Sequence, residues 1–380
     1  MEIIKTLYAL THPRRSFGLD FSSHLDATCS WILYAQRMSG NGGISKGYDL
    51  LRNRWAAAYP ETTGYTIPTL LNVANLYNRS DLYQAAIKAA DFLLNGFLRA
   101  GGIIHWQADI HQQPIVFDTG QVIFGWIAAY QYSQDFRYIE AAKNAAEWLI
   151  SVQDKSGAWH KHQHLGTVKV IDTRVSWGLL ELSKYISEDK FERAAIHNLN
   201  WALENQHQDG WFHHCVFKEN EYPLTHTLAY SAEGLLMSGK ILNEDRYIHA
   251  ARQTAMALRN MQRKDGSLPS NYAQGWIPKS QSSCLTGNCQ SAILWMHFYQ
   301  IEQDQKYLEA AIQAINFVAS VQNMEKKYPE LYGGIPGSYP IWGHYERLKY
   351  PNWAAKFFVD ALIMFDLSTK KQSTLLKYPG

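Results

Sequence analysis

The stretch "VFDTGQVIFGWIAAY" (116–130) is matched further along the chain by "VIDTRVSWGLLELSKY" (170–185), which also opens with two apolar residues and Asp-Thr. The interval between the two Asp-Thr pairs recurs before a third copy, "LTHTLAYSAEGLLMSG" (224–239), where His226-Thr227 replaces Asp-Thr. A motif that returns at one fixed interval is typical of a repeat architecture. Each copy begins an apolar, aromatic-rich helix pattern, so the repeat predicts buried helices that each carry a polar residue at the same end.

A second helical pattern follows each buried one, with apolar positions at intervals of three and four and charges on one face. These outer patterns cover 81–98, 135–153, 189–206, 245–262 and 305–322. Four of them end in Gln before a Gly-containing turn, and glycine suits a helix end where a positive φ is required. The repeat unit is therefore one inner helix followed by one outer helix.

The inner and outer helices are predicted to close into a ring. The inner helices are expected to begin near Thr62, Thr119, Thr173, Thr227, Thr286 and Asn352. Only five outer patterns lie between these six starts, and the N-terminal "SSHLDATCSWILYAQRM" (22–38) supplies the sixth. The sequence thus predicts an all-α fold, an (α/α)6 barrel or double-layered helical toroid. It forms a single domain over 1–380, and its N-terminal helix closes the ring with the C-terminal helix.

Bulk composition narrows the class of protein. With 46% hydrophobic and 18% charged residues, the 380-residue chain resembles an ordinary soluble globular protein. A net charge of +2 offers no electrostatic case for binding nucleic acid or a membrane surface. No signal peptide and no membrane span is expected. Four scattered cysteines do not make a disulfide framework, so the sequence predicts a cytoplasmic protein with reduced thiols.

The N-terminal ends of the inner helices should gather at one mouth of the barrel, together with the long loops that precede them. These loops are rich in aromatic residues, which is typical of a cleft for a ligand with apolar faces and many hydroxyls. Sugars fit that description, while plain loop packing is the alternative. The predicted aromatic platforms are Trp106, Trp211, Trp276, Trp342 and Tyr345.

The segment from Phe117 to about Ala195 resembles the unsaturated uronyl hydrolases, which are cytoplasmic (α/α)6 enzymes. In that family one Asp precedes the helix of the second repeat, and another, in an Ile-Asp-Asn context, precedes the third and is the general acid/base. Asp118 in "VFDTG" and Asp172 in "VIDTR" match those positions in order and context. The family's Arg-Gly-Gln-Ala-Trp motif has no counterpart in "THTLAYSAEGLL" (225–236).

A second resemblance lies at the C-terminal end. The run "GGIPGSYPIWGHYERLKYPNWAAKFFVDALI" (333–363) is similar, more weakly, to the helical domain of glucuronyl C5-epimerases. Sugar 2-epimerases share the barrel and use histidines at its mouth, for which His105, His226 and His344 are candidates. Because fold-level likeness does not choose among these chemistries, the site residues must do so.

Glycosidic bond cleavage commonly uses two carboxylates, one as proton donor and one that activates water or attacks. Asp172 and Asp118 begin neighbouring inner helices and are predicted to be that pair, although Asp is also a preferred helix cap. Glu61 is a third acid at the mouth. His226 is placed to bind hydroxyls or move a proton, and Tyr345 joins the candidate acid/base groups.

Other side chains are predicted to bind substrate. Arg174 is expected to face the mouth, where it would pair with a substrate carboxylate or with Asp118. The remaining candidates are Glu346 and Arg347 as an acid and anion-binding pair, with His105 and His213 beside the loop tryptophans. No cofactor or metal is predicted, since "HKHQH" (160–164) and "HHC" (213–215) lack the Cys-His-Gly signature of lanthionine-synthetase-like zinc toroids.

Three functions remain open from the sequence. The first is a glycoside hydrolase acting on an oligosaccharide, with uronic-acid-containing chains among the candidates. The second is a uronate or sugar epimerase or a polysaccharide lyase, which would abstract a proton with Tyr or His. The third is a non-catalytic glycan-binding toroid. In each case the expected partner is an oligosaccharide or polysaccharide.

Overall fold

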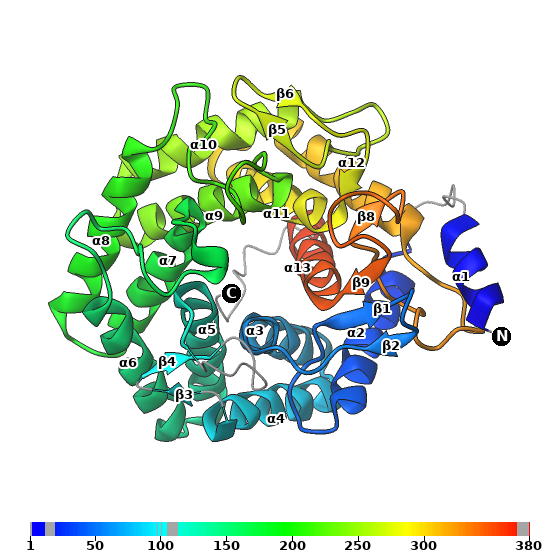
Figure 1. The fold of residues 1–380 in the computed structure, drawn as a ribbon, viewed down its shortest axis with the longest axis horizontal. Helices are drawn as coiled ribbons and strands as arrows, with labels where there is room; N and C mark the ends of the chain where they lie inside the picture. Colours follow the sequence, from blue (N-terminus) through cyan, green and yellow to red (C-terminus); the bar gives the residue numbers. More distant parts are fainter. Residues whose placement is uncertain (1, 12–19, 97, 100, 105–112, 371–379) are drawn as a thin grey trace.

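The structure is a computed structural model that describes residues 2–11, 20–96, 98–99, 101–104, 113–370 and 380. In these residues the chain forms two concentric layers of helices around a central axis (Figure 1). The inner layer holds α3 (Pro60–Tyr77), α5 (Val116–Ser133), α7 (Thr173–Ser183), α9 (Thr225–Leu242), α11 (Leu285–Glu302) and α13 (Asn352–Thr369). The outer layer holds α2 (Phe21–Ser39), α4 (Ser80–Gly96), α6 (Phe136–Ser151), α8 (Asp189–Glu204), α10 (Asp245–Asn260) and α12 (Gln305–Val321).

The ring closes as the sequence predicted. Each inner helix packs against the next, and α13 packs against α3 to complete the circle. Helix α2 packs on α13 and on α4, so the N-terminal outer helix is the partner of the last inner helix. The (α/α)6 barrel is therefore confirmed. A further helix, α1 (Glu2–Thr11), stands outside the two layers, beside the labelled N-terminus (Figure 1).

The two layers differ in burial as their sequence patterns require. In α5 every residue from 116 to 129 is buried, because an inner helix has protein on all sides. In α6 the buried positions recur at intervals of three and four along one face. Small residues permit close contact in the inner layer: a Cβ added to Gly125 of α5 would lie 2.5 Å from the carbonyl oxygen of Gly64 in α3.

The glutamines that end the outer helices tie neighbouring repeats together. Nε2 of Gln153, just after α6, donates to the carbonyl of Gly157 in its own turn and to that of Ala194 in α8, both at 2.9 Å. The same bond to the next outer helix recurs in the pairs Gln36–Ala85, Gln206–Ala250 and Gln262–Ala310. Because each amide satisfies a buried carbonyl group, these turns are structural features of the repeat.

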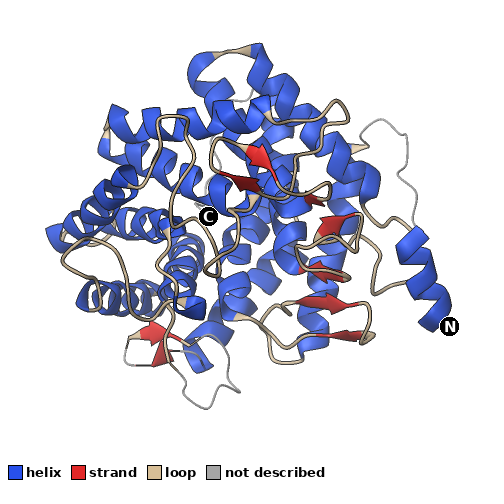
Figure 2. Cartoon of the chain, turned by 45° about the horizontal axis from the view of Figure 1, so that its top comes forward, coloured by secondary structure: helices blue, strands red, loops and turns tan. Residues whose placement is uncertain are grey.

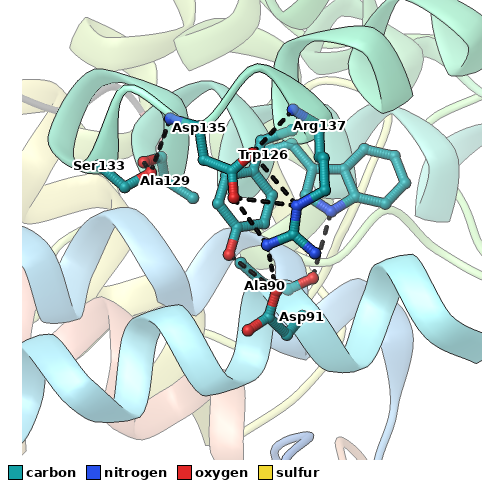
Figure 3. A network of polar contacts seen from close by, with 8 residues as sticks. Ala90, Asp91, Trp126, Ala129, Ser133, Asp135 and Arg137 are labelled. Carbon is teal, nitrogen blue, oxygen red and sulfur yellow. Dashed lines mark hydrogen bonds and ion pairs between the residues drawn. The ribbon is translucent and has the colours of Figure 1, made fainter.

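Ion pairs supplement these contacts on the outer surface. Figure 3 shows Arg137 of α6, whose guanidinium lies 2.6 Å from Asp135, the residue that caps the same helix, and 3.7 Å from Asp91 of α4. Beside them Nε1 of Trp126 in α5 donates to the carbonyl of Ala90 in α4 at 3.4 Å. The arginine is solvent-exposed, so its ion pairs add little stability.

Short strands stiffen the loops between outer and inner helices (Figure 2). One sheet has the order β2 (Arg54–Trp55), β1 (Gly47–Asp49) and β9 (Lys349–Pro351), so it joins the loop before α3 to the loop before α13. The paired strands elsewhere are β3 (Leu98–Arg99) with β4 (Gly102–Ile103), β5 (Tyr272–Ala273) with β6 (Ile277–Pro278), and β7 (Ser283–Cys284) with β8 (Ser338–Tyr339). Among the described helices, none has the length and apolar character to cross a membrane.

Candidate active site

A cavity of about 670 Å³ opens at the mouth where the inner helices begin. Loops from several repeats line it, so residues far apart in the sequence meet there. Its ionisable lining residues are Glu61, Asp118, Glu221, Glu346, Lys46, Lys169, Lys218, Lys279, His164, His226, His344, Tyr59, Tyr222, Tyr230 and Tyr345. A wall of this kind, with acids, lysines and tyrosines around one space, suits a polar ligand.

Asp118 lies in the first turn of α5 and lines this cavity, although its side chain is almost completely buried. The N-cap residue of α5 is Ile115, which makes no side-chain capping bond. Asp118 is therefore not the N-cap residue of α5, which was the alternative role expected for it. Asp118 interacts electrostatically with Tyr59, at the start of α3, and with Lys169.

Asp172 lies at the end of a short 3₁₀ turn, η2 (Val170–Asp172), which leads directly into α7. Its carboxyl group is fully buried and makes no side-chain capping bond to the helix. Oδ2 accepts a hydrogen bond of 2.6 Å from Nε2 of Gln163, while Oδ1 has no partner among the described residues. Burial raises the pKa of Asp172 to about 7, against the opposing effects of Lys169 and this hydrogen bond. Asp172 is thus a carboxyl group that holds its proton near neutral pH.

Asp172 does not itself line the cavity. Ile171, the residue before it, forms part of the cavity wall, as do Gln163 and Lys169, which contact or face its carboxyl group. The carboxyl therefore lies directly behind the wall.

Lys169 is a buried cation in this wall. Nζ donates to the carbonyl oxygens of His164 and Thr167 at 2.5 and 2.6 Å. Burial lowers its pKa to about 8, and the nearby charges of Asp172 and Asp118 oppose that shift. The two aspartates of the repeat are therefore joined electrostatically through one lysine.

Glu61 belongs to the same space. It lies in the first turn of α3, and Oε2 accepts a hydrogen bond of 2.8 Å from the hydroxyl of Tyr59. Burial, followed by the charges of Asp118 and Glu61, raises the pKa of Tyr59 well above its ordinary value. The tyrosine therefore remains a proton donor to Glu61 at all ordinary pH values.

His226 and Tyr345 meet on another side of the cavity, with ring centroids 5.4 Å apart, and Tyr230 lies 4.5 Å from His226. Nδ1 of His226 lies 2.7 Å from Oε1 of Gln290. Since that oxygen only accepts, Nδ1–H is the donor and the lone pair is on Nε2. Burial lowers the pKa of His226 to about 4, so this imidazole is neutral at pH 7.

Arg174 does not face the mouth as the sequence predicted. Its side chain is fully buried in the barrel interior, where it forms an ion pair with Glu233 of α9. Nε donates to Oε1 of Gln121 at 3.1 Å, and the guanidinium lies 4.8 Å from the ring centroid of Tyr230. Since Glu233 already pairs with its charge, Arg174 packs beneath the ring of Tyr230 as a structural residue of the barrel interior.

The three predicted tryptophan platforms within the described residues do not line the cavity. Trp211 and Trp276 are buried and donate from their indole nitrogens to the carbonyls of Tyr272 and Asp209, respectively. Trp342 is 51% exposed and lines a separate apolar hollow of about 260 Å³ near α1. Of the platforms within the described residues, only Tyr345 lines the main cavity.

Of the other predicted binding residues, some line the cavity and others do not. Glu346 lines the cavity and pairs with Lys349 at 2.9 Å. Arg347 is solvent-exposed and is not part of the cavity wall. His213 pairs with His207 through their Nε2 atoms, 2.7 Å apart, also outside the cavity. His105 and Trp106 lie outside the described residues.

No cluster of three or more His, Cys, Asp or Glu side chains that suits a metal ion occurs within the described ranges. The four cysteines are buried free thiols. The ionisable side chains that line the cavity carry carboxyl, imidazole, phenol and ammonium groups.

Sequence reasoning missed several residues that the fold brings to the site. They are Lys46, Tyr59, Gln163, Lys169 and Tyr230. A signal existed for Lys169, because an isolated lysine stands in the apolar run "VKVID" just before Asp172. Gln163 and Tyr59 gave no such signal, since their roles depend on loops from different repeats.

Comparisons with known proteins agree with this architecture. The family model described as the ulvan lyase N-terminal domain matches residues 99–269. An unsaturated glucuronyl hydrolase from Bacillus sp. GL1, described as responsible for the degradation of glycosaminoglycan, superposes with a TM-score of 0.73 at 12% identity. That match covers 92% of this chain and 97% of the other. No curated protein sequence matches the chain.

Two further solved structures share the fold but carry out other reactions. Cellobiose 2-epimerase from Bacillus thermoamylovorans B4167 has a TM-score of 0.68 at 13% identity, over 85% of this chain and 92% of its own. A GH76 α-mannanase from Bacteroides thetaiotaomicron has a TM-score of 0.68 at 15% identity, over 93% and 98%. At such identities the likeness establishes the fold, and the reaction must be argued from the site.

Proposed function

We propose that this protein is a glycan-processing enzyme that hydrolyses a glycosidic bond in a negatively charged oligosaccharide. The observation that carries the proposal is the pair of aspartates at the starts of two adjacent inner helices, α5 and α7, joined electrostatically by Lys169. Glycoside hydrolysis requires one protonated and one ionised carboxyl group at the same bond. Burial supplies the first of these at Asp172, because it raises the pKa of that carboxyl.

In this proposal Asp172 donates its proton to the glycosidic oxygen as the bond to the anomeric carbon breaks. Asp118 is the second carboxylate and activates the attacking water molecule. Asp172 reaches the substrate after the Gln163 side chain turns away from Oδ2, so substrate binding and access to the acid are coupled. Glu61 lies on the same side as Asp118 and hydrogen-bonds to Tyr59, where it would bind sugar hydroxyls.

The lysines of the cavity wall, which stand beside an equal number of acidic residues, support a carboxylate-bearing substrate. Four lysines line the wall, and Lys46 and Lys279 stand over the aromatic rings of Tyr59 and Tyr222, at 5.0 and 5.3 Å from the ring centroids. Ammonium groups beside aromatic faces would hold a uronic acid by its charge and by its apolar ring face together. Fold relatives described as acting on glycosaminoglycan are consistent with this class.

A second candidate function is β-elimination or epimerisation of a uronate. It is favoured by the neutral His226, whose Nε2 lone pair is free of Gln290, and by the adjacent Tyr230 and Tyr345. In a lyase the base removes the proton next to the carboxylate, a C=C bond forms, and the leaving sugar oxygen takes up a proton. The match to the ulvan lyase N-terminal domain includes His226 and Tyr230.

Mass spectrometry of a uronate-containing oligosaccharide panel separates these reactions. Incubation in heavy-oxygen water should give shortened products that carry one heavy oxygen, as hydrolysis requires. Shortened products without heavy oxygen, accompanied by the ultraviolet absorbance of a new C=C bond, would establish a lyase instead. Unshortened products that gain deuterium in deuterium oxide would establish an epimerase. Binding with no turnover would leave a glycan-binding toroid.

The proposed setting is cytoplasmic. Burial raises the pKa of the Cys29 and Cys284 thiols to about 12, so both are kept from reacting. Four buried free thiols are typical of proteins in reducing compartments. With a net charge of +2, the chain offers no sequence-independent attraction to nucleic acid, so the proposed partner is the glycan.

A further inference from the structure

We propose that Lys169 is the positioning residue of the two-aspartate site. Its ammonium group, bonded to the carbonyls of His164 and Thr167, acts on both aspartates and sets the pH at which Asp172 gives up its proton. The inference rests on the function proposed above, because it takes Asp172 as the acid and Asp118 as the second carboxyl group of the site. Neither the repeat motif nor the two-carboxylate mechanism by itself calls for a lysine at this place.

The geometry around Nζ supports this role. Lys169 is 1% exposed, and two of its three donor positions point at the carbonyl oxygens of His164 and Thr167. Carbonyl groups solvate an ammonium group but do not neutralise it. The anions that act on this buried charge are Asp172 and Asp118.

Charge balance then distinguishes the two aspartates. If both were ionised beside Lys169, the buried cluster would carry one net negative charge. With Asp172 protonated, Lys169 and Asp118 balance, and no uncompensated charge remains in the protein interior. The proton is assigned to Asp172, because its carboxyl group is fully buried, burial raises its pKa and it is not among the residues that line the cavity.

The other charged groups around the turn leave this balance unchanged. Helices α5, α7 and α9 pack against η2. From α5 the charged group is Asp118 itself. Arg174 of α7 and Glu233 of α9 form an ion pair with one another, and His226 of α9 is neutral. Among the described charged groups on η2 and the helices packed against it, Lys169 is thus the cation that acts on both aspartates.

Lys169 also holds the loop that carries Gln163. The loop has left-handed backbone at His162 (φ 60°) and Leu165 (φ 62°), and the bonds from Nζ fasten it across η1 (His164–Gly166). If Lys169 were purely structural, its role would end with these two hydrogen bonds to the loop. A positioning role requires in addition that the charge of Lys169 changes the proton affinity of Asp172.

The test is a direct titration of Asp172 in the unliganded protein by NMR of carboxyl-¹³C aspartate, with Asp172→Asn to assign the resonance. Lys169→Met should raise the midpoint of Asp172 by about one unit or more, a tenfold change in proton affinity. Lys169→Arg should restore the wild-type midpoint, because it keeps the charge. Lys218→Met is the matched control: it removes an exposed cavity lysine, and the Asp172 midpoint should not move.

An unchanged Asp172 midpoint in Lys169→Met, with the protein folded, would overturn the proposal and leave Lys169 a loop fastener. If Lys169→Met unfolds, a midpoint in Lys169→Arg displaced by a unit or more would overturn it equally. In the pH profile of kcat/KM the basic limb should move to higher pH in Lys169→Met, since the acid keeps its proton longer. Should Asp172→Asn retain full turnover, the proposed hydrolase function fails, while the NMR titration still decides the role of Lys169.

Discussion

Nε2 of Gln163, a residue of the cavity wall, donates a 2.6 Å hydrogen bond to Oδ2 of Asp172, whose carboxyl group is fully buried. A carboxyl group buried in this way keeps its proton because burial disfavours its charged form. The hydrogen bond links this buried carboxyl to a residue that lines the cavity.

Asp172→Asn tests the proton donor. Asparagine keeps the size and the acceptor for Gln163 but cannot donate a proton as a carboxyl group does, so turnover should fall about 10²–10⁴-fold. Binding of oligosaccharide should persist in calorimetry. Asp189→Asn, at a carboxylate on the surface of α8 that is 90% exposed, is the matched control and should leave kcat unchanged. Loss of binding and of fold together in Asp172→Asn would contradict a catalytic role.

The stability of the protein should depend on pH through the same group. Because the folded-state pKa of Asp172 is raised to about 7 from about 4 in the unfolded chain, the native state binds the proton more tightly. This contribution to stability is complete at low pH and is lost as pH rises from about 4 through 7. The melting temperature of Asp172→Asn minus that of the wild type should therefore increase over this range and level off above it. A difference that is constant with pH would refute the assignment.

Arg174→Met should unfold more readily than the wild type by about 3–5 kcal/mol in urea titrations, since it leaves Glu233 as an unpaired buried charge. The double variant Arg174→Met/Glu233→Leu should recover a large part of that loss. Arg193→Met removes an exposed arginine of α8 and should change stability by less than about 0.5 kcal/mol. If the double variant were no better than the single one, the ion pair would not be the source of the effect.

The tryptophans should separate into structural and surface residues. Trp276→Ala should lower the free energy of unfolding by about 3 kcal/mol, because it empties a buried position and removes the bond to Asp209. Trp342→Ala should change it by less than about 0.5 kcal/mol, as an exposed side chain. If Trp342 is an outer platform for sugar, its loss should weaken binding of long oligosaccharides about fivefold, or about 1 kcal/mol, and leave short ones unaffected. Equal effects on both lengths would exclude that role.

Lys279→Met should raise KM for a uronate oligosaccharide about fivefold at low ionic strength, with kcat nearly unchanged, because the lysine acts on substrate charge at the rim. The effect should shrink in high salt, where charges more than about 3 Å apart are screened at 1 M. Lys264→Met, an exposed lysine in the turn after α10 and outside the cavity, should have no effect. A KM increase that persists with a neutral oligosaccharide would mean that Lys279 acts by shape instead.

Much of the fold was predictable from local patterns. The interval of the repeat, the apolar inner helices and the one-sided outer helices predict the ring and its closure by α2 and α13, and the structure confirms each. Helix starts were displaced by only a few residues: α3 begins at Pro60 rather than Thr62, and α5 at Val116 rather than Thr119. These differences are small because burial periodicity, which comes from the helix itself, defines an element better than its ends.

The site was less predictable, because the direction of its side chains depends on residues that are far away in the sequence. That the repeat aspartates lie at one mouth follows from the sequence, since inner helices run parallel and present equivalent ends. Where a side chain points after a 3₁₀ turn or within a loop depends on what packs against it. Arg174 illustrates this, because Glu233, a repeat away, draws it into the interior.

The sequence by itself thus determined the barrel, its single mouth and the two aspartates beside it, because repeat interval and helical periodicity are properties of neighbouring residues. Only the tertiary structure decided that Gln163 hydrogen-bonds to the buried Asp172, that Lys169 acts on both aspartates, and that Trp211, Trp276 and Trp342 do not line the cavity. Those outcomes depend on burial and on charges brought together from separate loops. Such effects exist only after the chain has closed into a ring.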